Sequence, residues 1–220
     1  MKYLLPLLAV AAIAAAPAPK PQPWIQGWER PADPLGDCRF DRDGETMTIT
    51  IPGKGHDFEV PNKRLHAPHL LRKVEGDFTV QVRIHGTFAE KMEQGDQRAG
   101  LLLTDGKFFF LVQFSANGVP EDRRYKFNRH FSTFGVKEGW NAFAPGPPAL
   151  DKPVYLRVKR IGNRIAPNWS LDGKTWSRNE ETYGFDHLPR TLKVGVIAEA
   201  TADRYFKVTL DEFKLTPQQK

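Results

Sequence analysis

Residues 74–84 read Val-Glu-Gly-Asp-Phe-Thr-Val-Gln-Val-Arg-Ile, and this stretch is the strongest indication of the architecture. Glu-Gly-Asp supplies turn-forming residues, and beyond it every second position is apolar: Phe78, Val80, Val82 and Ile84. Successive side chains of a β-strand point to opposite faces, so this alternation predicts a strand with one buried and one exposed face. A turn that leads into such a strand is typical of an antiparallel sheet.

The same alternation recurs along most of the chain, between turn signals. It is clear in residues 47–51 and 124–131, and further strands are expected over residues 99–103, 108–114, 154–159, 164–171, 192–200 and 206–215. Asp105-Gly106 and Gly162-Asn163 are two-residue turns that favour β-hairpins. Residues 134–150 are rich in Gly, Pro and aromatic side chains and are expected to form a loop. About ten to twelve strands without a long amphipathic helix predict an all-β jelly roll, a sandwich of two antiparallel sheets.

The beginning of the chain has a different character. Lys2 is followed by an apolar run over residues 4–16, and Ala12-Ile-Ala14 has the small-x-small pattern that signal peptidase cleaves. We predict a signal peptide over residues 1–14, cleaved between 14 and 16, and therefore a secreted or periplasmic protein. A membrane span needs about 20 apolar residues, so no membrane insertion is expected. A Pro-rich spacer (15–23), one domain (24–216) and a short tail (217–220) follow in this interpretation.

The composition is that of a globular domain with a modest basic excess. Of 220 residues, 32 are Lys or Arg and 26 are Asp or Glu, which leaves a net charge of +6. No nucleic-acid-binding motif accompanies this charge, so no nucleic-acid partner is expected. Cys38 is the single cysteine and cannot form an internal disulfide. A chain of this length can bury enough surface to fold without a disulfide or a structural metal, and a monomer is expected.

Several segments follow one another in an order that resembles one superfamily. They are Gly27-Trp28, Asp37-Cys38, His56-Asp57, Ala67-Pro68 and residues 74–82, 99–103, 170–176 and 194–196. Together they resemble the concanavalin A-like lectin/glucanase superfamily. More narrowly, the sequence is similar to an uncharacterised bacterial family of sandwich domains with a "regulation of enolase" label, related to the C-terminal sandwich of β-xylosidases. The resemblance implies a jelly roll with sugar as the usual ligand on its concave face, and it implies no reaction.

One strand departs from the pattern that the resemblance implies. In such domains the strand matching residues 108–114 commonly presents Arg and Glu to the concave face, whereas Leu111 and Gln113 occupy these positions here. This strand therefore offers no charged side chain to the concave face at these two positions. Phe109 and Leu111 are expected to form an apolar floor or to be covered by a loop.

A carbohydrate-binding site is the first functional prediction. Flat aromatic rings stack on sugar rings, while Arg, Asn, Gln and His give oriented hydrogen bonds to hydroxyl groups. The candidate residues on the expected concave face and its flanking loop are Arg98, Phe109, Gln113, Arg124, His130, Trp140 and Glu199. Trp140 either stacks on the ligand or caps the core under the loop. An anionic polysaccharide would suit the exposed basic residues expected here, which are Arg123, Arg124, Lys126 and Arg129.

A glycoside-active enzyme is the alternative prediction. Retaining glycosidases use two carboxyl groups about 5 to 5.5 Å apart, which on one strand means two residues apart. Glu199 is the one carboxylate well placed in an expected central strand, and it has no such neighbour. It needs a carboxylate from another strand; otherwise it forms an ion pair with Arg157 or another basic residue. A structural or protein-interaction domain of the cell envelope is the third hypothesis.

No metal site or cofactor is predicted. His66 and His69 are three residues apart and face opposite ways in an extended chain. Residues 41–44 resemble the start of a calcium loop but lack the acidic ligand at its end. Cys38 is expected to be a buried apolar residue rather than a nucleophile. The sequence therefore predicts an exported, non-catalytic, carbohydrate-binding β-sandwich.

Overall fold

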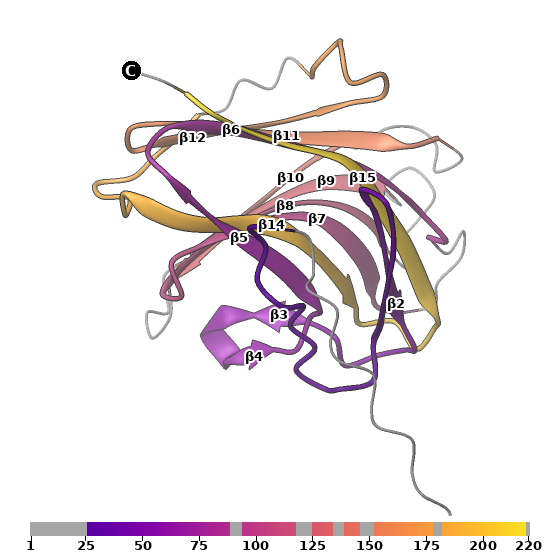
Figure 1. Cartoon of the computed structure of the whole chain (residues 1–220). Helices are drawn as coiled ribbons and strands as arrows, with labels where there is room; N and C mark the ends of the chain where they lie inside the picture. The colour runs from indigo at the N-terminus through magenta and orange to yellow at the C-terminus, as the bar shows by residue number, and fades with distance from the viewer. Residues whose placement is uncertain are drawn as a thin grey trace, which may run out of the picture.

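Two antiparallel sheets pack face to face, as the side view in Figure 1 shows. The computed structural model describes residues 26–88, 94–117, 125–133, 139–145, 152–177 and 182–218. The sandwich confirms the all-β prediction. The predicted signal peptide and spacer lie outside the described residues. Within the described ranges, no helix is long and apolar enough to cross a membrane.

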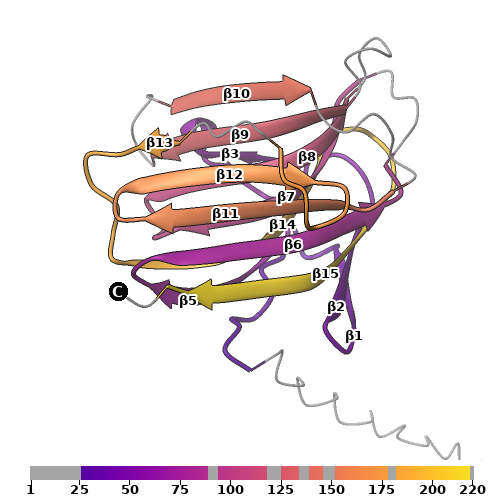
Figure 2. The same ribbon diagram turned by 90° about the horizontal axis from the view of Figure 1, so that it is seen from above.

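One sheet has seven strands, seen face-on in Figure 2. From edge to edge they are β1 (Arg39–Asp43), β2 (Thr46–Ile51), β15 (Phe206–Pro217), β6 (Phe78–Gly86), β11 (Val154–Ile161), β12 (Arg164–Ser170) and β13 (Tyr183–Gly184). Strand β6 contains the alternating stretch that predicted the fold. Phe78, Val80 and Val82 are fully buried in it, because they face the other sheet.

The other sheet has six strands. From edge to edge they are β10 (Gly139–Pro145), β9 (Tyr125–Thr133), β8 (Phe108–Asn117), β7 (Asp96–Thr104), β14 (Thr191–Ala200) and β5 (His69–Glu75). Strands β7 and β8 form the hairpin predicted at Asp105-Gly106. Asp105 Oδ1 accepts the backbone amides of Lys107 at 2.8 Å and Phe108 at 2.7 Å, which stabilises the turn.

Strand β10 corrects the expectation of a loop over residues 134–150. Residues 139–145 pair with β9 and form the edge of the six-stranded sheet. An edge strand needs backbone hydrogen bonds on one side only, so it tolerates the proline that ends it, Pro145. Trp140 therefore belongs to a strand rather than to a loop.

The main hydrophobic core lies between the two sheets. Its largest fully buried side chains are aromatic: Phe78, Phe110, Phe114, Phe127 and Phe206. They come from strands of both sheets, so the core holds the sandwich together. Removing one such ring from water stabilises the fold by about 1.5 to 3 kcal/mol.

A short hairpin lies on the outer face of the six-stranded sheet, away from the other sheet (Figure 1). It consists of β3 (Phe58–Glu59), the 3-10 helix η1 (Val60–Asn62) and β4 (Arg64–Leu65), and we call it the covering hairpin. Lys63 turns the chain between η1 and β4 in the left-handed conformation, with φ 56°. The hairpin and the sheet bury a second apolar cluster, made of Phe58, Val60, Leu65, Ala67, Leu71, Leu102, Phe109, Leu111 and Ile197.

An irregular segment before β1 runs beside β5, the other edge of the six-stranded sheet. The amide of Glu29 donates to Leu71 O at 2.8 Å. Ala32 and His69 exchange two backbone hydrogen bonds, of 2.8 and 3.0 Å. Residues 28–32 therefore satisfy part of the backbone of β5 without forming a regular strand.

Candidate functional site

Three of the predicted site residues meet on the outer face of the six-stranded sheet. Arg98, Gln113 and Glu199 come from the neighbouring strands β7, β8 and β14, and the register sets Glu199 opposite Arg98. Gln113 Nε2 donates a hydrogen bond to Glu199 Oε1, and Arg98 Nη1 lies 3.6 Å from Glu199 Oε2. Glu199 is therefore the centre of this group.

The covering hairpin closes Glu199 off from solvent. The exposed fraction is 2% for both Glu199 and Gln113. The backbone amide of Phe58 donates to Glu199 Oε2 at 3.2 Å. Burial raises the pKa of Glu199, and the negative charge of Asp57 acts in the same direction, although Arg98 opposes the rise. Glu199 therefore combines a raised pKa with exclusion from bulk water.

Arg98 is the member of this group that reaches the surface. Its side chain is 30% exposed and pairs with Asp96 on the same strand. Its Nε is buried and has no hydrogen-bond partner among the described residues. The ion-pair partner of Glu199 is thus Arg98 and not Arg157, which lies in the other sheet with its guanidinium 3.8 Å from the ring centroid of Trp176.

Phe109 is covered and does not present a ring to solvent. Its exposed fraction is 5%, and its ring packs edge-on against Phe58, with 5.4 Å between the centroids. Leu111, with 2% exposure, lies in the same apolar cluster. The sequence allowed Phe109 and Leu111 either to form an open apolar floor or to be covered by a loop. In the structure they are covered. The reason is that the covering hairpin supplies apolar side chains of its own to this face.

The covering hairpin also brings charged residues to which no sequence signal pointed. Arg64 Nε lies 3.0 Å from Asp57 Oδ2, and Arg64 Nη2 pairs with Glu59. The Arg64 side chain is 49% exposed, whereas that of Asp57 is 9% exposed. Asp57, which precedes the hairpin, the hairpin itself and the sheet together form what we call the junction cluster, made of Asp57, Glu59, Arg64, Arg98, Gln113 and Glu199. No spacing rule connects Asp57, Glu59 and Arg64 to the other three, because these segments are far apart in the sequence.

Of the remaining predicted residues, His130 and Trp140 belong to the strands toward the β10 edge of the sheet. Arg124 falls outside the described residues. His130 is in β9, opposite Leu111 of β8, and Trp140 is in β10, opposite Phe131 of β9. The backbone thus continues the sheet from the strand of Gln113 to the strand of Trp140.

Arg129 corrects the expectation of an exposed basic row. Its exposed fraction is 3%, and its guanidinium lies over the rings of Phe127 and Tyr183, 5.6 and 5.8 Å from their centroids. Arg129 is two residues from Phe127, so the alternation of the strand directs both side chains into the core. A polyanion cannot reach Arg129 in this structure.

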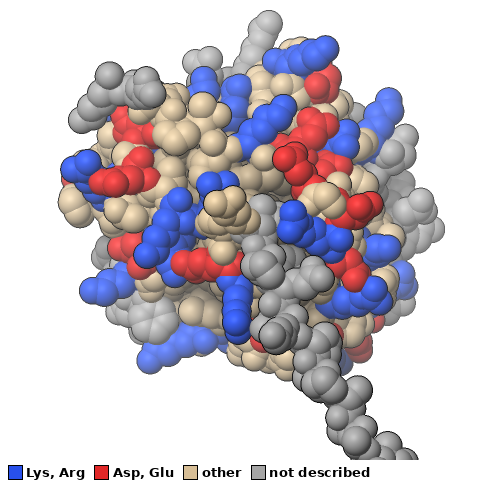
Figure 3. All heavy atoms as spheres, in the orientation of Figure 1, with Lys and Arg blue, Asp and Glu red and all other residues tan. Residues whose placement is uncertain are grey.

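The charges on the face shown in Figure 3 are mixed. Lys and Arg side chains are interspersed there with Asp and Glu. A continuous strip of one sign is what tracks a phosphate backbone, and the described residues of this face do not form one.

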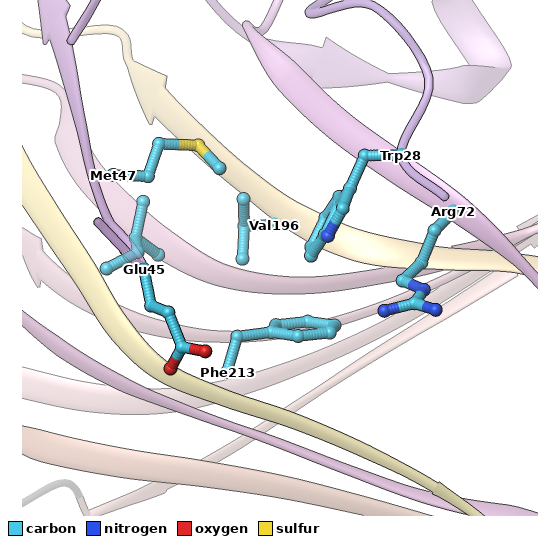
Figure 4. Close-up of a pocket in the computed structure, with 7 residues that line it drawn as sticks. Trp28, Glu45, Met47, Arg72, Val196 and Phe213 are labelled. Carbon is cyan, nitrogen blue, oxygen red and sulfur yellow. The ribbon is translucent and has the colours of Figure 1, made fainter. Parts of the chain in front are cut away.

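A separate pocket of about 120 Å³ opens between the two sheets (Figure 4). Its lining residues are Trp28, Glu45, Met47, Arg72, Val196, Leu210 and Phe213. The rings of Trp28 and Phe213 meet edge-on at 4.6 Å, and the guanidinium of Arg72 lies 5.8 Å from the Trp28 ring. Sites for drug-sized ligands occupy about 300 to 1,000 Å³. This pocket is too small for a sugar chain.

Solved structures with the same architecture include a lectin-like domain and an enzyme. A functionally unknown protein from Saccharomyces cerevisiae matches with a TM-score of 0.67 and 19% identity, over 88% of this chain and 96% of that one. A legume lectin-like domain from Entamoeba histolytica matches with a TM-score of 0.52 and 12% identity, over 89% and 92%. The fold is concanavalin A-like. An alginate lyase from Klebsiella pneumoniae shares this concanavalin A-like fold, with a TM-score of 0.55 and 12% identity over 81% and 84%.

These comparisons confirm the predicted concanavalin A-like fold. No family model matches the sequence, and no curated protein matches it. Membership of the narrower bacterial sandwich-domain family therefore stays a prediction. The concanavalin A-like fold accommodates both binding and catalysis, so the function has to be argued from the residues of the site.

Proposed function

We propose that this chain is an exported, non-catalytic domain that binds carbohydrate on the outer face of the six-stranded sheet, beside the junction cluster. The observation that carries the proposal is the convergence of Arg98, Gln113 and Glu199 from three neighbouring strands. The shared fold with a legume lectin-like domain supports carbohydrate as the ligand class.

Arg98 is the residue that contacts the ligand in this proposal. A guanidinium offers N–H donors in a fixed plane, which suits neighbouring sugar hydroxyls or a sugar carboxylate. Arg98 is part-exposed, with 30% of its side chain open to solvent. Glu199 and Gln113 are buried behind it, so they act as positioning residues rather than as direct contacts.

The strands beyond β8 complete the proposed site. His130 of β9, in the register row of Leu111, and Arg124 supply hydrogen bonds. Trp140 of β10 stands in the register row of Phe110, which faces the core, so the proposed site does not depend on it. Phe109 supports the covering hairpin instead of the ligand, because Phe58 lies against it. A sugar chain would therefore run from the junction cluster toward the β10 edge.

Binding to a panel of neutral and anionic polysaccharides tests this proposal. Arg98→Ala and His130→Ala should each weaken binding about tenfold or more, the effect of removing a central contact. Arg190→Ala is the matched control: it removes the same charge from an 83% exposed arginine that pairs with Glu75, and binding should not change. A blank panel for the wild type, or unchanged binding by both test variants, contradicts the proposal.

The raised pKa of Glu199 and the nearby carboxylate of Asp57 favour a second candidate, a glycoside-active enzyme. A carboxyl group that holds its proton can serve as a general acid, and a second carboxylate can serve as its partner. A substrate would have to displace the covering hairpin to reach Glu199. Reducing-sugar release that Glu199→Gln abolishes would establish this activity, and no release by the wild type from the same panel sets it aside.

A structural role in the cell envelope is distinguished by the same experiments. It predicts co-purification with a protein partner and no affinity for glycans. Export itself is tested by N-terminal sequencing of the protein recovered from periplasm or medium. The mature chain should begin after a residue between 14 and 16, and an intact Met1 on the recovered protein contradicts the predicted signal peptide.

A further inference from the structure

Three side chains with metal-binding atoms meet away from the junction cluster, in the loops next to β1 and β2. They are Asp37 and Cys38, which precede β1, and His56, which follows β2. One carboxylate oxygen, the Sγ and one ring nitrogen all lie within 4.8 Å of one another. His56 is 1% exposed, whereas the Asp37 side chain is 49% exposed. The group therefore has a buried side and a side open to solvent.

Both ring nitrogens of His56 lie beside oxygen atoms that accept hydrogen bonds. Nδ1 lies 2.8 Å from the carbonyl oxygen of Gly53, which can only accept, so Nδ1 carries a proton. The neutral ring then presents a lone pair at Nε2, and Nε2 lies 2.8 Å from Asp37 Oδ1, which is also an acceptor. Either a proton or a metal cation must lie between these two acceptor atoms.

The hydrogen bond at Nδ1 of His56 is one that metal-binding histidines also make. A histidine that binds a metal through one nitrogen usually donates the other N–H to a carbonyl or carboxylate, which fixes the ring. Gly53 O has this role here. The backbone of His56 is also fixed, since it exchanges hydrogen bonds of 3.1 and 3.0 Å with Ala200 at the end of β14.

The loop that carries the other two ligands is held in place by Asp33. Its Oδ2 accepts the amide of Cys38 at 2.9 Å, and its Oδ1 accepts the amide of Gly36 at 3.0 Å. Asp37 Oδ1 lies 3.8 Å from Cys38 Sγ. Two carboxylates therefore lie next to the thiol, and their negative charge favours a divalent cation there.

The group does not have the geometry of a nucleophilic triad. In a triad the histidine contacts the nucleophile through one nitrogen and a carboxylate through the other. Here Asp37 occupies Nε2 and a backbone carbonyl occupies Nδ1, so no ring nitrogen is available to Cys38. Metal coordination is the chemistry that uses all three side chains at once.

We propose that Asp37, Cys38 and His56 bind a divalent transition-metal cation, with Zn²⁺ as the best match. A mixed set of sulfur, imidazole nitrogen and carboxylate oxygen suits Zn²⁺ or Co²⁺, whereas Ca²⁺ and Mg²⁺ prefer oxygen ligands alone. Tetrahedral Zn²⁺ would separate Nε2 and the carboxylate oxygen by about 3.4 Å. The half-exposed Asp37 side chain can make this small outward movement, and the fourth position remains for water.

The site would link the loop before β1 to the segment that leads into the covering hairpin. His56 stands two residues before Phe58, whose amide binds Glu199. A cation would therefore tie the loop before β1 to the segment that enters β3. This inference does not depend on the proposed carbohydrate function.

Metal titration of the purified protein tests the inference. After treatment with a chelator, the wild type should bind one Zn²⁺ per chain by calorimetry, and Co²⁺ should give a thiolate-to-metal charge-transfer band. Cys38→Ser should lose that band, and Cys38→Ser and Asp37→Asn should each weaken Zn²⁺ binding at least about tenfold. Asp203→Asn is the matched control, because it removes a nearby exposed carboxylate that pairs with Lys54, and it should bind Zn²⁺ like the wild type.

A second measurement keeps the test independent of variant folding. Zn²⁺ should slow the alkylation of Cys38 by iodoacetamide in the wild type, and Mg²⁺ should not. A wild type that binds no Zn²⁺, or a Co²⁺ band that survives Cys38→Ser, overturns the inference. In that case His56 and Asp37 form a hydrogen-bonded pair without a metal.

Discussion

The amide of Phe58 donates to Glu199 Oε2, while the ring of the same residue packs edge-on against Phe109. One residue therefore attaches the covering hairpin to the sheet through a polar and an apolar contact. The hairpin is a fixed part of the outer face. It covers some candidate residues, and a ligand can reach only those that it leaves exposed.

Truncation of Phe58 should loosen this attachment. Phe58 is 5% exposed, and removing a buried phenylalanine ring costs about 3 to 5 kcal/mol in the free energy of unfolding. Urea unfolding of Phe58→Ala should show this loss. Leu35→Ala, at a position that is 45% exposed, should stay within about 0.5 kcal/mol of the wild type. Equal losses for the two variants would mean that the hairpin is not packed as described.

Glu199→Gln should change the pH dependence of stability. The folded-state pKa of Glu199 lies above its ordinary value of 4.5, chiefly because of burial. A raised carboxyl pKa contributes stability that is fully present below the unfolded-state pKa and is lost as the pH rises through the folded-state pKa. Glutamine has no such dependence. The variant should therefore gain stability relative to the wild type as the pH rises between these two pKa values, by at most about 1.4 kcal/mol for each pH unit.

Urea unfolding of both proteins at a series of pH values measures this difference. Arg98 favours the ionised form and Asp57 opposes it, so both charges are included in the expected direction. A stability difference that does not change with pH, or that changes in favour of the wild type, contradicts a raised pKa at Glu199.

Gly195→Ala should disrupt the six-stranded sheet. A Cβ at this position in β14 would lie 1.9 Å from the carbonyl oxygen of Leu70 in β5, so the backbone of one strand must move. Overpacking of this kind costs about 1 to 3 kcal/mol or more. Gly184→Ala, where a Cβ would meet nothing within 4 Å, should have little effect. Thermal unfolding of the two variants compares them, and a stable Gly195→Ala protein would contradict the close approach of β14 and β5.

The fold was predictable because its signals are local. The alternation over β6 and the turns at Asp105-Gly106 and Gly162-Asn163 each require only neighbouring residues. The strand at residues 139–145 was missed because Gly and Pro suggest a loop, whereas pairing with β9 at the edge overrides that preference. The covering hairpin is too short to show the periodic pattern of apolar residues by which a strand or helix is predicted.

The site was predictable only in part, for the same physical reason. Arg98, Gln113 and Glu199 were chosen by residue type and strand, and the sheet does bring them together. Their burial was not predictable, because it depends on Phe58, which belongs to a different segment. Likewise, the group of Asp37, Cys38 and His56 forms across 19 positions of sequence through loop conformations that no pattern encodes.

The segment of residues 28–32 has a consequence for how this protein behaves beside other copies of itself. A sheet edge with free N–H and C=O groups recruits strands from other chains and so promotes aggregation. Residues 28–32 occupy part of the edge of β5 with backbone hydrogen bonds, yet they are too irregular to offer a new edge in turn. These hydrogen bonds therefore hinder a strand of another copy from pairing with this part of the β5 edge.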